Sequence, residues 1–162
     1  MPFYAHTKEN TDGSPAAQSE WELLFTPFGD GDKECQGKNG DSCQKCHDMD
    51  PQHGHLNKVA YWSGKFAAEM FPEEADRESA RQWGYLAGLW HDLGKFSEKF
   101  QNYLTKVSDI HCDEILERID HTSTGAKLSA SKSFPLGHCI STAIAHKASL
   151  DPKCRFQRPA VG

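Results

Sequence analysis

The chain has 162 residues, of which 37% are hydrophobic, and a formal net charge of -5 at pH 7. This length suits one domain with a single core, which we expect over residues 1–150, followed by a tail over 151–162. The acidic balance excludes a protein that holds nucleic acid by bulk electrostatic attraction alone. No apolar run is long enough to span a bilayer, and the chain does not open with a charged-then-apolar signal segment. We therefore expect a cytoplasmic protein.

The first segment, up to Phe28, predicts one short helix. Ser19 is a suitable N-cap, and Glu20 and Glu22 in the first turn would complement the helix dipole. His6 is either a buried, hydrogen-bonded histidine near the edge of the domain or a contributor to a site. We favour the structural role.

Residues 29–54 differ in composition, being rich in Gly, Asp, Asn and Lys with almost no large apolar residue. They predict a long surface insertion. Cys43 and Cys46 have the spacing of a zinc knuckle, and Cys35 with His47 or His53 could complete four ligands. A structural zinc and a mobile loop with reduced thiols fit this pattern about equally well. A disulfide framework fits it less well.

From His55 the apolar pattern becomes helical. The first helix is expected to end before Pro72. Its predicted buried stripe consists of Leu56, Val59, Ala60, Ser63, Phe66, Ala67 and Met70. A second helix is predicted from about Glu73 to Leu93. In it Gly84 and Gly88 would let a neighbouring helix approach closely, and Gly94 would end it.

The remaining chain continues the helical pattern. Ser97 is expected to cap a short helix whose Phe100, Tyr103 and Leu104 face inward. An amphipathic segment follows over 107–119, then a capping cluster beginning at Asp120, a helix over 126–132 and a last apolar helix over 139–146. No stretch shows convincing strand alternation, so the predicted fold class is all-α.

The stretch from Leu86 to Lys95 is central to the predicted function. An apolar helix runs into the pair His91-Asp92, and an imidazole beside a carboxylate suits a divalent transition ion. Lys95 follows, where an ammonium could meet a phosphate as a point charge. Alone, the pair is equally typical of the end of a buried helix. Histidines at the ends of four inward-facing predicted helices favour a metal site instead: His55, His91, His121 and His146.

The order of these motifs resembles the HD nuclease of type I CRISPR systems, which is the HD subunit or domain of the interference helicase–nuclease. That family belongs to the HD phosphohydrolase superfamily. The resemblance covers nearly the whole chain except the insertion and the tail, and it implies an HD-domain helical bundle. The matching motifs are Tyr4-Ala-His-Thr7, Trp21, His55-Leu-Asn-Lys-Val-Ala60 with Phe66-Ala67, Gly88-Leu-Trp-His-Asp-Leu-Gly-Lys-Phe96, Phe100-Gln-Asn-Tyr-Leu104 and Asp120-His-Thr-Ser-Thr-Gly-Ala126.

The resemblance implies metal-dependent cleavage of single-stranded DNA, which a helicase unwinds after a guide-RNA surveillance complex has selected it. Residues that match the family's metal ligands are His55, His91, Asp92 and His121, and Lys95 matches its active-site lysine. A late family motif aligns His146 with a further ligand, but Lys147 stands where a second histidine is expected. Members of the family continue through more helices, so the resemblance suggests a C-terminally truncated domain and leaves a second metal position open.

The chemistry of these residues suits a phosphodiesterase. Cations would polarise the scissile phosphate and lower the pKa of bound water. Asp92 is the best bridging ligand, and Lys95 would stabilise the charge that develops on the phosphate. Imidazole-rich coordination favours Mn, Ni, Co or Fe over Mg. Two alternatives remain: an HD phosphohydrolase acting on nucleotides, and a degenerate, non-catalytic HD module of a CRISPR complex.

Overall fold

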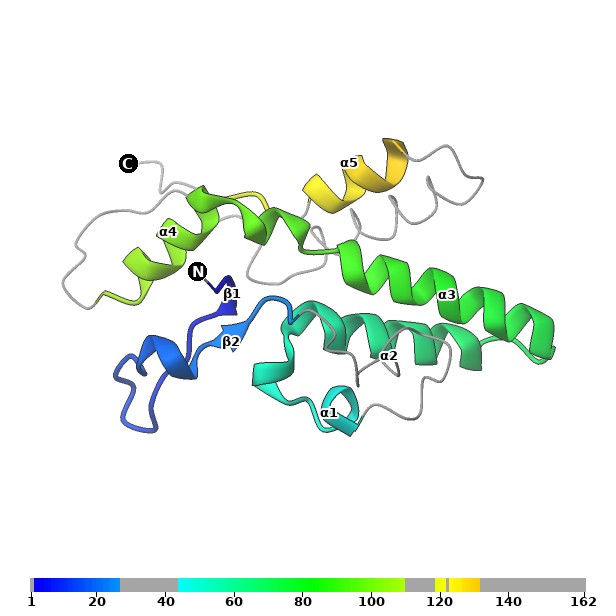
Figure 1. The fold of residues 1–162 in the computed structure, drawn as a ribbon, viewed down its shortest axis with the longest axis horizontal. Coiled ribbons are helices and arrows are strands. Elements are labelled where there is room, and N and C mark those ends of the chain that lie inside the picture. The colour runs from blue at the N-terminus through cyan, green and yellow to red at the C-terminus, as the bar shows by residue number, and fades with distance from the viewer. Residues whose placement is uncertain (1, 27–43, 110–118, 122, 132–162) are drawn as a thin grey trace, which may run out of the picture.

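The computed structural model describes residues 2–26, 44–109, 119–121 and 123–131. Within these ranges the chain is mostly helical, which confirms the predicted all-α class. Two long helices lie side by side as an antiparallel pair (Figure 1): α2 (His55–Glu69) and α3 (Glu74–Trp90). Both were predicted, with bounds that differ by a few residues. None of the helices in these ranges combines the length and the apolar character that crossing a bilayer requires.

Glycines set the close packing of α2 against α3. A Cβ atom at Gly84 would lie 2.4 Å from the carbonyl oxygen of Ser63, and one at Gly88 would lie 2.6 Å from that of Val59. Larger residues at these positions would push the two backbones apart, so the predicted close approach is confirmed. Because the pair is antiparallel, the start of α2 lies beside the end of α3.

The buried face of α2 differs from the predicted stripe. Phe66 and Met70 are 57% and 80% exposed, whereas Asn57 and Lys58 are buried. The Asn57 amide donates to the backbone oxygen of Thr26 at 3.1 Å, and Lys58 forms an ion pair with Glu22. The spacing of apolar residues along α2 predicts that Asn57 and Lys58 face solvent. They are buried instead because polar groups of the N-terminal segment pair with them.

The N-terminal segment forms a small β-hairpin in place of the predicted helix. Strand β1 (Tyr4–His6) pairs in an antiparallel manner with β2 (Glu22–Leu23), and His6 lies opposite Glu22. Only a short 3-10 turn, η1 (Gln18–Glu20), is helical in this region. The sequence did not indicate this hairpin, because strands of two or three residues are too short to show alternation.

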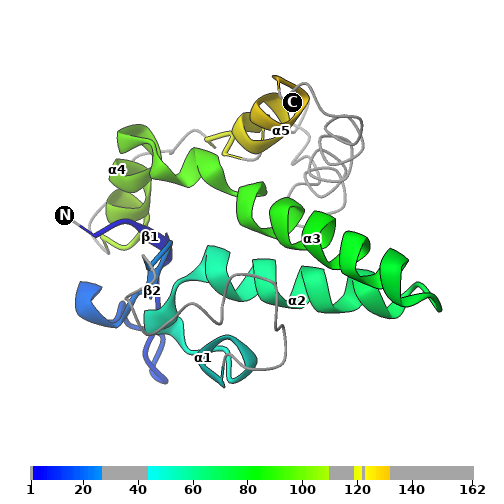
Figure 2. The ribbon, with the colours of Figure 1, turned by 45° about the vertical axis from the view of Figure 1, so that its right-hand side comes forward.

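The hairpin is held by apolar contacts on both sides of the helix junction. One buried cluster joins the N-terminal segment to the start of α2 through Ala5, Leu24 and Leu56. A second cluster joins Trp21 to Phe100 and Leu104 of the next helix, α4 (Glu98–Val107). Figure 2 shows β1 and β2 between the start of α2 and α4. These contacts fix the hairpin against the ends of the long helices.

Helix α3 ends at Trp90, and a short 3-10 turn, η4 (Leu93–Phe96), follows it. Gly94 lies within this turn and is not the helix terminator that was predicted. Its N–H donates to the carbonyl oxygen of His121 at 3.1 Å, and a Cβ there would lie 2.3 Å from that oxygen. Gly94 is therefore needed for the close approach of the segment that carries His121.

The caps of the last two described helices follow the sequence. Ser97 Oγ accepts from the N–H of Phe100 at 3.2 Å, as predicted for the start of α4. Helix α5 (Ser123–Ser131) begins earlier than expected, and Asp120 Oδ1 accepts from its first N–H at 3.1 Å. The other helices predicted beyond Asp109, apart from α5, and the tail lie outside the described residues.

Part of the predicted surface insertion is structured. Its end forms the short helix α1 (Gln44–His47) and the 3-10 turn η3 (Pro51–His53). Cys46 is buried against Tyr61 and Trp62, and the His47 ring lies 5.7 Å from the Trp62 ring. Residues 44–54 are thus folded onto α2, so this part of the predicted insertion has helical structure and contacts the core. The predicted zinc knuckle stays a prediction, because Cys35 and Cys43 lie outside the described residues.

Candidate metal centre

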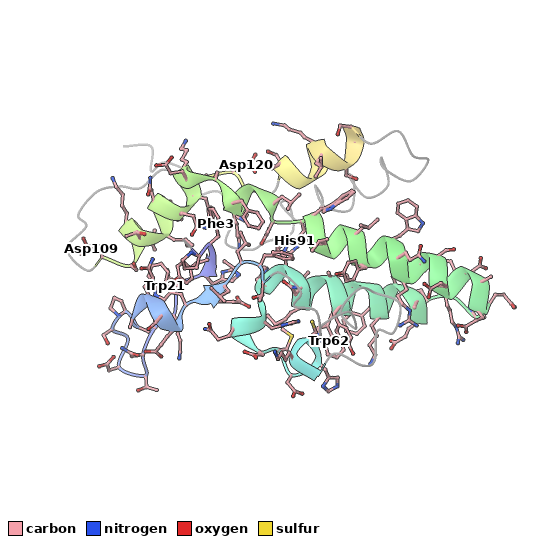
Figure 3. The ribbon with its side chains drawn as sticks, in the orientation of Figure 1. Phe3, Trp21, Trp62, His91, Asp109 and Asp120 are labelled. Atoms are coloured by element: carbon pink, nitrogen blue, oxygen red, sulfur yellow. The ribbon has the colours of Figure 1, made fainter. Side chains whose placement is uncertain are left out.

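Four of the predicted ligands meet where α2 begins and α3 ends. His55 is the first residue of α2, and His91 and Asp92 directly follow α3. His121 precedes α5 and is held there by the contact between its carbonyl oxygen and Gly94. Figure 3 shows His91 at this junction, between the two long helices. The predicted ligand His146 lies outside the described residues.

Three donor atoms form a compact triangle. The Nε2 atoms of His55 and His91 are 3.3 Å apart, and they lie 3.4 Å and 3.1 Å respectively from Asp92 Oδ2. Ligands bound to one transition ion at about 2.0–2.2 Å lie roughly 3–3.5 Å from each other. The triangle therefore has the dimensions of one face of a coordination sphere.

The histidines are oriented by their second ring nitrogens. His91 Nδ1 lies 2.6 Å from the carbonyl oxygen of Gly88, and His121 Nδ1 lies 3.2 Å from that of Ile119. Each carbonyl accepts a hydrogen bond from Nδ1–H, which leaves Nε2 as the atom with the lone pair. In both residues, as in His55, Nε2 faces Asp92, with His121 Nε2 at 3.8 Å from Asp92 Oδ1.

Asp92 is an ionised carboxylate in a buried position. Its side chain is 2% exposed. Burial alone would raise the pKa of Asp92, but the interactions with His55 and His91 and the charge of Lys95 outweigh it and lower the pKa well below its usual range. Asp92 therefore provides a full negative charge for a bound cation across the neutral pH range.

His55 interacts with carboxylates on both sides of its ring. Burial lowers the pKa of His55, but the interactions with Asp92 and Glu22 outweigh this and raise it. The carboxylates thus favour positive charge at His55. A cation bound by Nε2 would offset their negative charge, so the donor set fits a divalent transition ion.

Lys95 is buried rather than projecting as a point charge toward solvent. Its side chain is 3% exposed, and Nζ lies 2.9 Å from Asp92 Oδ2. Nζ also donates to the carbonyl oxygen of Ala5 at 3.2 Å and lies 3.4 Å from His6 Nε2. In this structure the Lys95 ammonium therefore neutralises Asp92. A substrate phosphate would have to enter the site to contact the ammonium.

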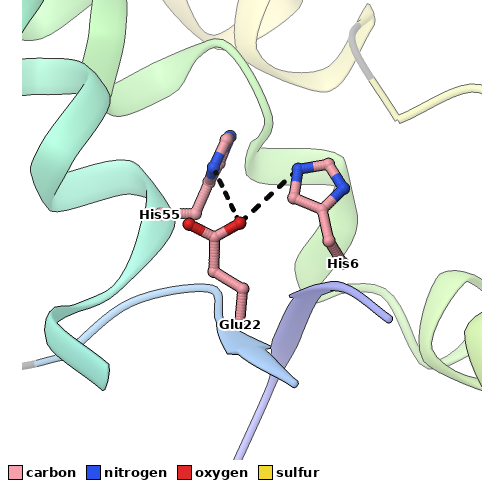
Figure 4. Close-up of side chains that lie close together, drawn as sticks. All are labelled: His6, Glu22 and His55. Carbon is pink, nitrogen blue, oxygen red and sulfur yellow. Dashed lines mark ion pairs between the residues drawn. The ribbon is translucent and has the colours of Figure 1, made fainter. Parts of the chain in front are cut away.

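Two further residues lie beside the site: Glu22, to which the sequence prediction gave no site role, and His6, for which a site role was the less favoured alternative. Glu22 Oε2 lies 3.5 Å from His55 Nδ1 and 3.8 Å from His6 Nε2 (Figure 4). Partial burial and the charge of Lys95 lower the pKa of His6 to about 4. His6, for which we favoured a structural role, is thus neutral and lies at the exposed rim of the site. The signal that could have indicated both is the hairpin register, which places His6 opposite Glu22.

Comparisons of the chain with protein-family models, with curated proteins and with solved structures found no match. The site is defined by its own geometry as a grouping of the partly buried His55 with the buried His91 and Asp92 at a helix junction. A third histidine and a lysine lie beside it. This arrangement is able to hold a divalent transition ion.

Proposed function

We propose that this chain is a metal-dependent phosphodiesterase with His55, His91 and Asp92 as its principal metal ligands and His121 beside them. The observation that carries the proposal is the triangle of donor atoms, whose edges measure 3.1, 3.3 and 3.4 Å around a buried carboxylate. When bound, a divalent ion at such a site polarises a phosphate oxygen and lowers the pKa of a bound water.

The protein residues supply position and charge for this chemistry. Gly88 fixes the tautomer of His91 through its carbonyl oxygen, and Asp92 supplies the negative charge. Lys95 places a cation beside Asp92, where it would also attract the phosphate of a substrate. Imidazole-rich coordination favours Mn, Ni, Co or Fe over Mg.

The proposed substrate is single-stranded DNA. It is supported by the resemblance of the motifs around His55, His91 and His121 to the HD nuclease of type I CRISPR systems. The net charge of -5 suits a nuclease to which a helicase and a guide-RNA complex deliver the strand. On this proposal the protein acts in the prokaryotic cytoplasm.

The test is cleavage of a labelled single-stranded DNA by metal-stripped protein resupplied with Mn, Ni, Co or Mg. We expect cutting with the transition metals to exceed cutting with Mg. We also expect Asp92→Ala to lose at least ~100-fold of the activity, because outer ligands alone are worth about 10–100-fold. Asp76→Ala, which removes an exposed carboxylate in the first turn of α3, is the matched control and should keep the parental rate.

The outcomes separate the alternatives. Equal rates with Mg alone would contradict the site described above. Hydrolysis of nucleotides without cleavage of DNA would indicate the HD phosphohydrolase instead. Binding of metal by folded protein, with no turnover of either substrate, would indicate a non-catalytic module.

A further inference from the structure

Glu22 and Lys58 lie directly behind His55, on the side of its ring that faces away from Asp92. We propose that they form an orienting pair: Glu22 accepts a hydrogen bond from the Nδ1–H of His55 and Lys58 fixes Glu22, so that Nε2 is presented to the metal. This inference rests on the metal centre of the proposed function and assigns positioning residues to it.

His55 needs a side-chain acceptor because of its place in the fold. His91 follows a helix, so the carbonyl oxygen of Gly88, three residues earlier, reaches its Nδ1. His55 is the first residue of α2 and follows Gly54, whose φ of 98° lies outside the helical region. The 3-10 turn η3 precedes it, but the carbonyl oxygen of Gln52, three residues before His55, accepts from Thr26 Oγ1 at 3.1 Å. Glu22 of β2 takes that place, with Oε2 at 3.5 Å from His55 Nδ1.

Lys58 holds Glu22 in this position. It lies three residues after His55 and so on the same face of α2. Its side chain is 4% exposed, and Nζ forms an ion pair with Glu22 Oε1, the oxygen that does not face His55. A buried ammonium without a partner destabilises the folded protein, so the ion pair with Lys58 keeps the Glu22 carboxylate in this position. The hairpin register holds the backbone of Glu22 opposite His6.

A second cation held by His6, Glu22 and His55 is the competing use of the same side chains. Their donor atoms lie within 4.8 Å of one another. That use would need the lone pair of His55 Nδ1 as well as Nε2, which a neutral imidazole does not offer. It would also place a cation beside two ammonium groups, since Lys58 contacts Glu22 and Lys95 Nζ lies 3.4 Å from His6 Nε2. Charge and tautomer both favour the orienting pair.

The first measurement is the affinity and stoichiometry of Co²⁺ binding to the full chain, by calorimetry and by the visible absorption of the bound ion. We expect Glu22→Ala to weaken binding by about 10–100-fold without changing the stoichiometry, as is typical for loss of an outer-shell partner of a histidine ligand. Lys58→Met should weaken it less. In the double variant the loss of Co²⁺ binding free energy should be smaller than the sum of the losses in the two single variants, because both residues act through His55. Glu20→Ala, which breaks a surface ion pair with Lys8, is the control and should bind as the parent does.

The second measurement is the tautomer of His55, from the ring ¹⁵N signals of the metal-free protein at alkaline pH. We expect the Nδ1–H form in the parent and a mixture of tautomers in Glu22→Ala. A purely structural role for Glu22 would leave this signal unchanged in the folded variant. Because it needs neither metal nor turnover, this readout tests the orienting pair even if the parent binds no Co²⁺, a result that would instead overturn the proposed function.

Two results would overturn the inference. One is a folded Glu22→Ala protein that keeps both the parental affinity and the Nδ1–H tautomer. The other is a stoichiometry that falls by one ion in both Glu22→Ala and His6→Ala, which would establish the second cation site.

Discussion

The function of Asp92 depends on how its buried charge is balanced. Four groups share its carboxylate: Lys95 at 2.9 Å, His91 at 3.1 Å and His55 at 3.4 Å from Oδ2, and His121 at 3.8 Å from Oδ1. An unpartnered charge in a buried position destabilises a protein strongly. At the scale of single residues, Lys95 therefore stabilises the metal-free site as well as serving the proposed reaction.

We expect Lys95→Met to lower the free energy of unfolding of the metal-free protein by about 3–5 kcal/mol, because Asp92 loses its closest cation. Added Mn should restore part of this stability, since the ion replaces the ammonium as a partner of Asp92. Urea unfolding with and without Mn measures both effects. Lys99→Met, at an exposed position in α4, serves as the control. An unchanged unfolding midpoint for Lys95→Met would show that Asp92 does not depend on this lysine.

At the scale of elements, glycines decide how closely the segments around the site approach. Gly88 and Gly84 allow α2 and α3 to pack closely, and Gly94 allows the backbone of His121 to pack against η4. A Cβ at Gly125 of α5 would lie 1.8 Å from the carbonyl oxygen of Trp90, at the end of α3. The sequence indicated the close approach within the helix pair. It assigned Gly94 a different role, because a glycine at a helix end is most often a C-cap.

We expect Gly94→Ala to lower the free energy of unfolding by roughly 1–3 kcal/mol through overpacking against His121. It should also weaken Co²⁺ binding, because the displaced backbone carries the His121 ring away from Asp92. Chemical unfolding and calorimetry measure the two effects. Asn102→Ala, at an exposed position of α4, is the control. Parental Co²⁺ affinity in a destabilised Gly94→Ala protein would remove His121 from the proposed ligand set.

At the scale of the whole molecule, the junction of α2, α3 and the hairpin gathers several ionised groups in a small volume. Burial raises the pKa of Glu22, but interactions with His55 and Lys58 outweigh it and lower the pKa to about 2, from 4.5. The pKa of Asp92 is lowered in the same way. Both carboxylates bind protons more weakly in the folded protein than in the unfolded chain. The contribution of Glu22 to stability is therefore present above about pH 4.5 and is lost as the pH falls toward about 2, and the contribution of Asp92 is likewise lost toward acid pH.

We expect the free energy of unfolding of the metal-free protein to fall as the pH is lowered from about 5 to about 3. For Glu22 the full contribution is on the order of 3 kcal/mol. Urea unfolding across this pH range measures the loss, and Glu22→Gln should flatten part of it. Glu69→Gln, which changes an exposed carboxylate at the end of α2, should not. A parent protein whose stability is constant down to about pH 3 would contradict the charge balance described here.

Sequence patterns predicted the helical class, the long helices and the caps at Ser97 and Asp120, because periodicity and capping are local properties of the chain. They also predicted that His55, His91 and His121 would lie at helix ends. They did not predict the short N-terminal elements, which are too short to show a periodic pattern. The helix predicted from Ser19 is a 3-10 turn followed by a strand, because this segment pairs with β1.

The sequence by itself therefore determined which residues are able to form a metal centre, since His, Asp and their helical positions are visible along the chain. Only the tertiary structure decided how they are oriented and which neighbours support them. Glu22 and Lys58 are separated by 36 residues, and the buried Lys58 forms an ion pair with the half-buried Glu22 beside His55. Such an ion pair forms only when folding brings two distant segments together. From the sequence alone, charged residues such as these are expected to face solvent.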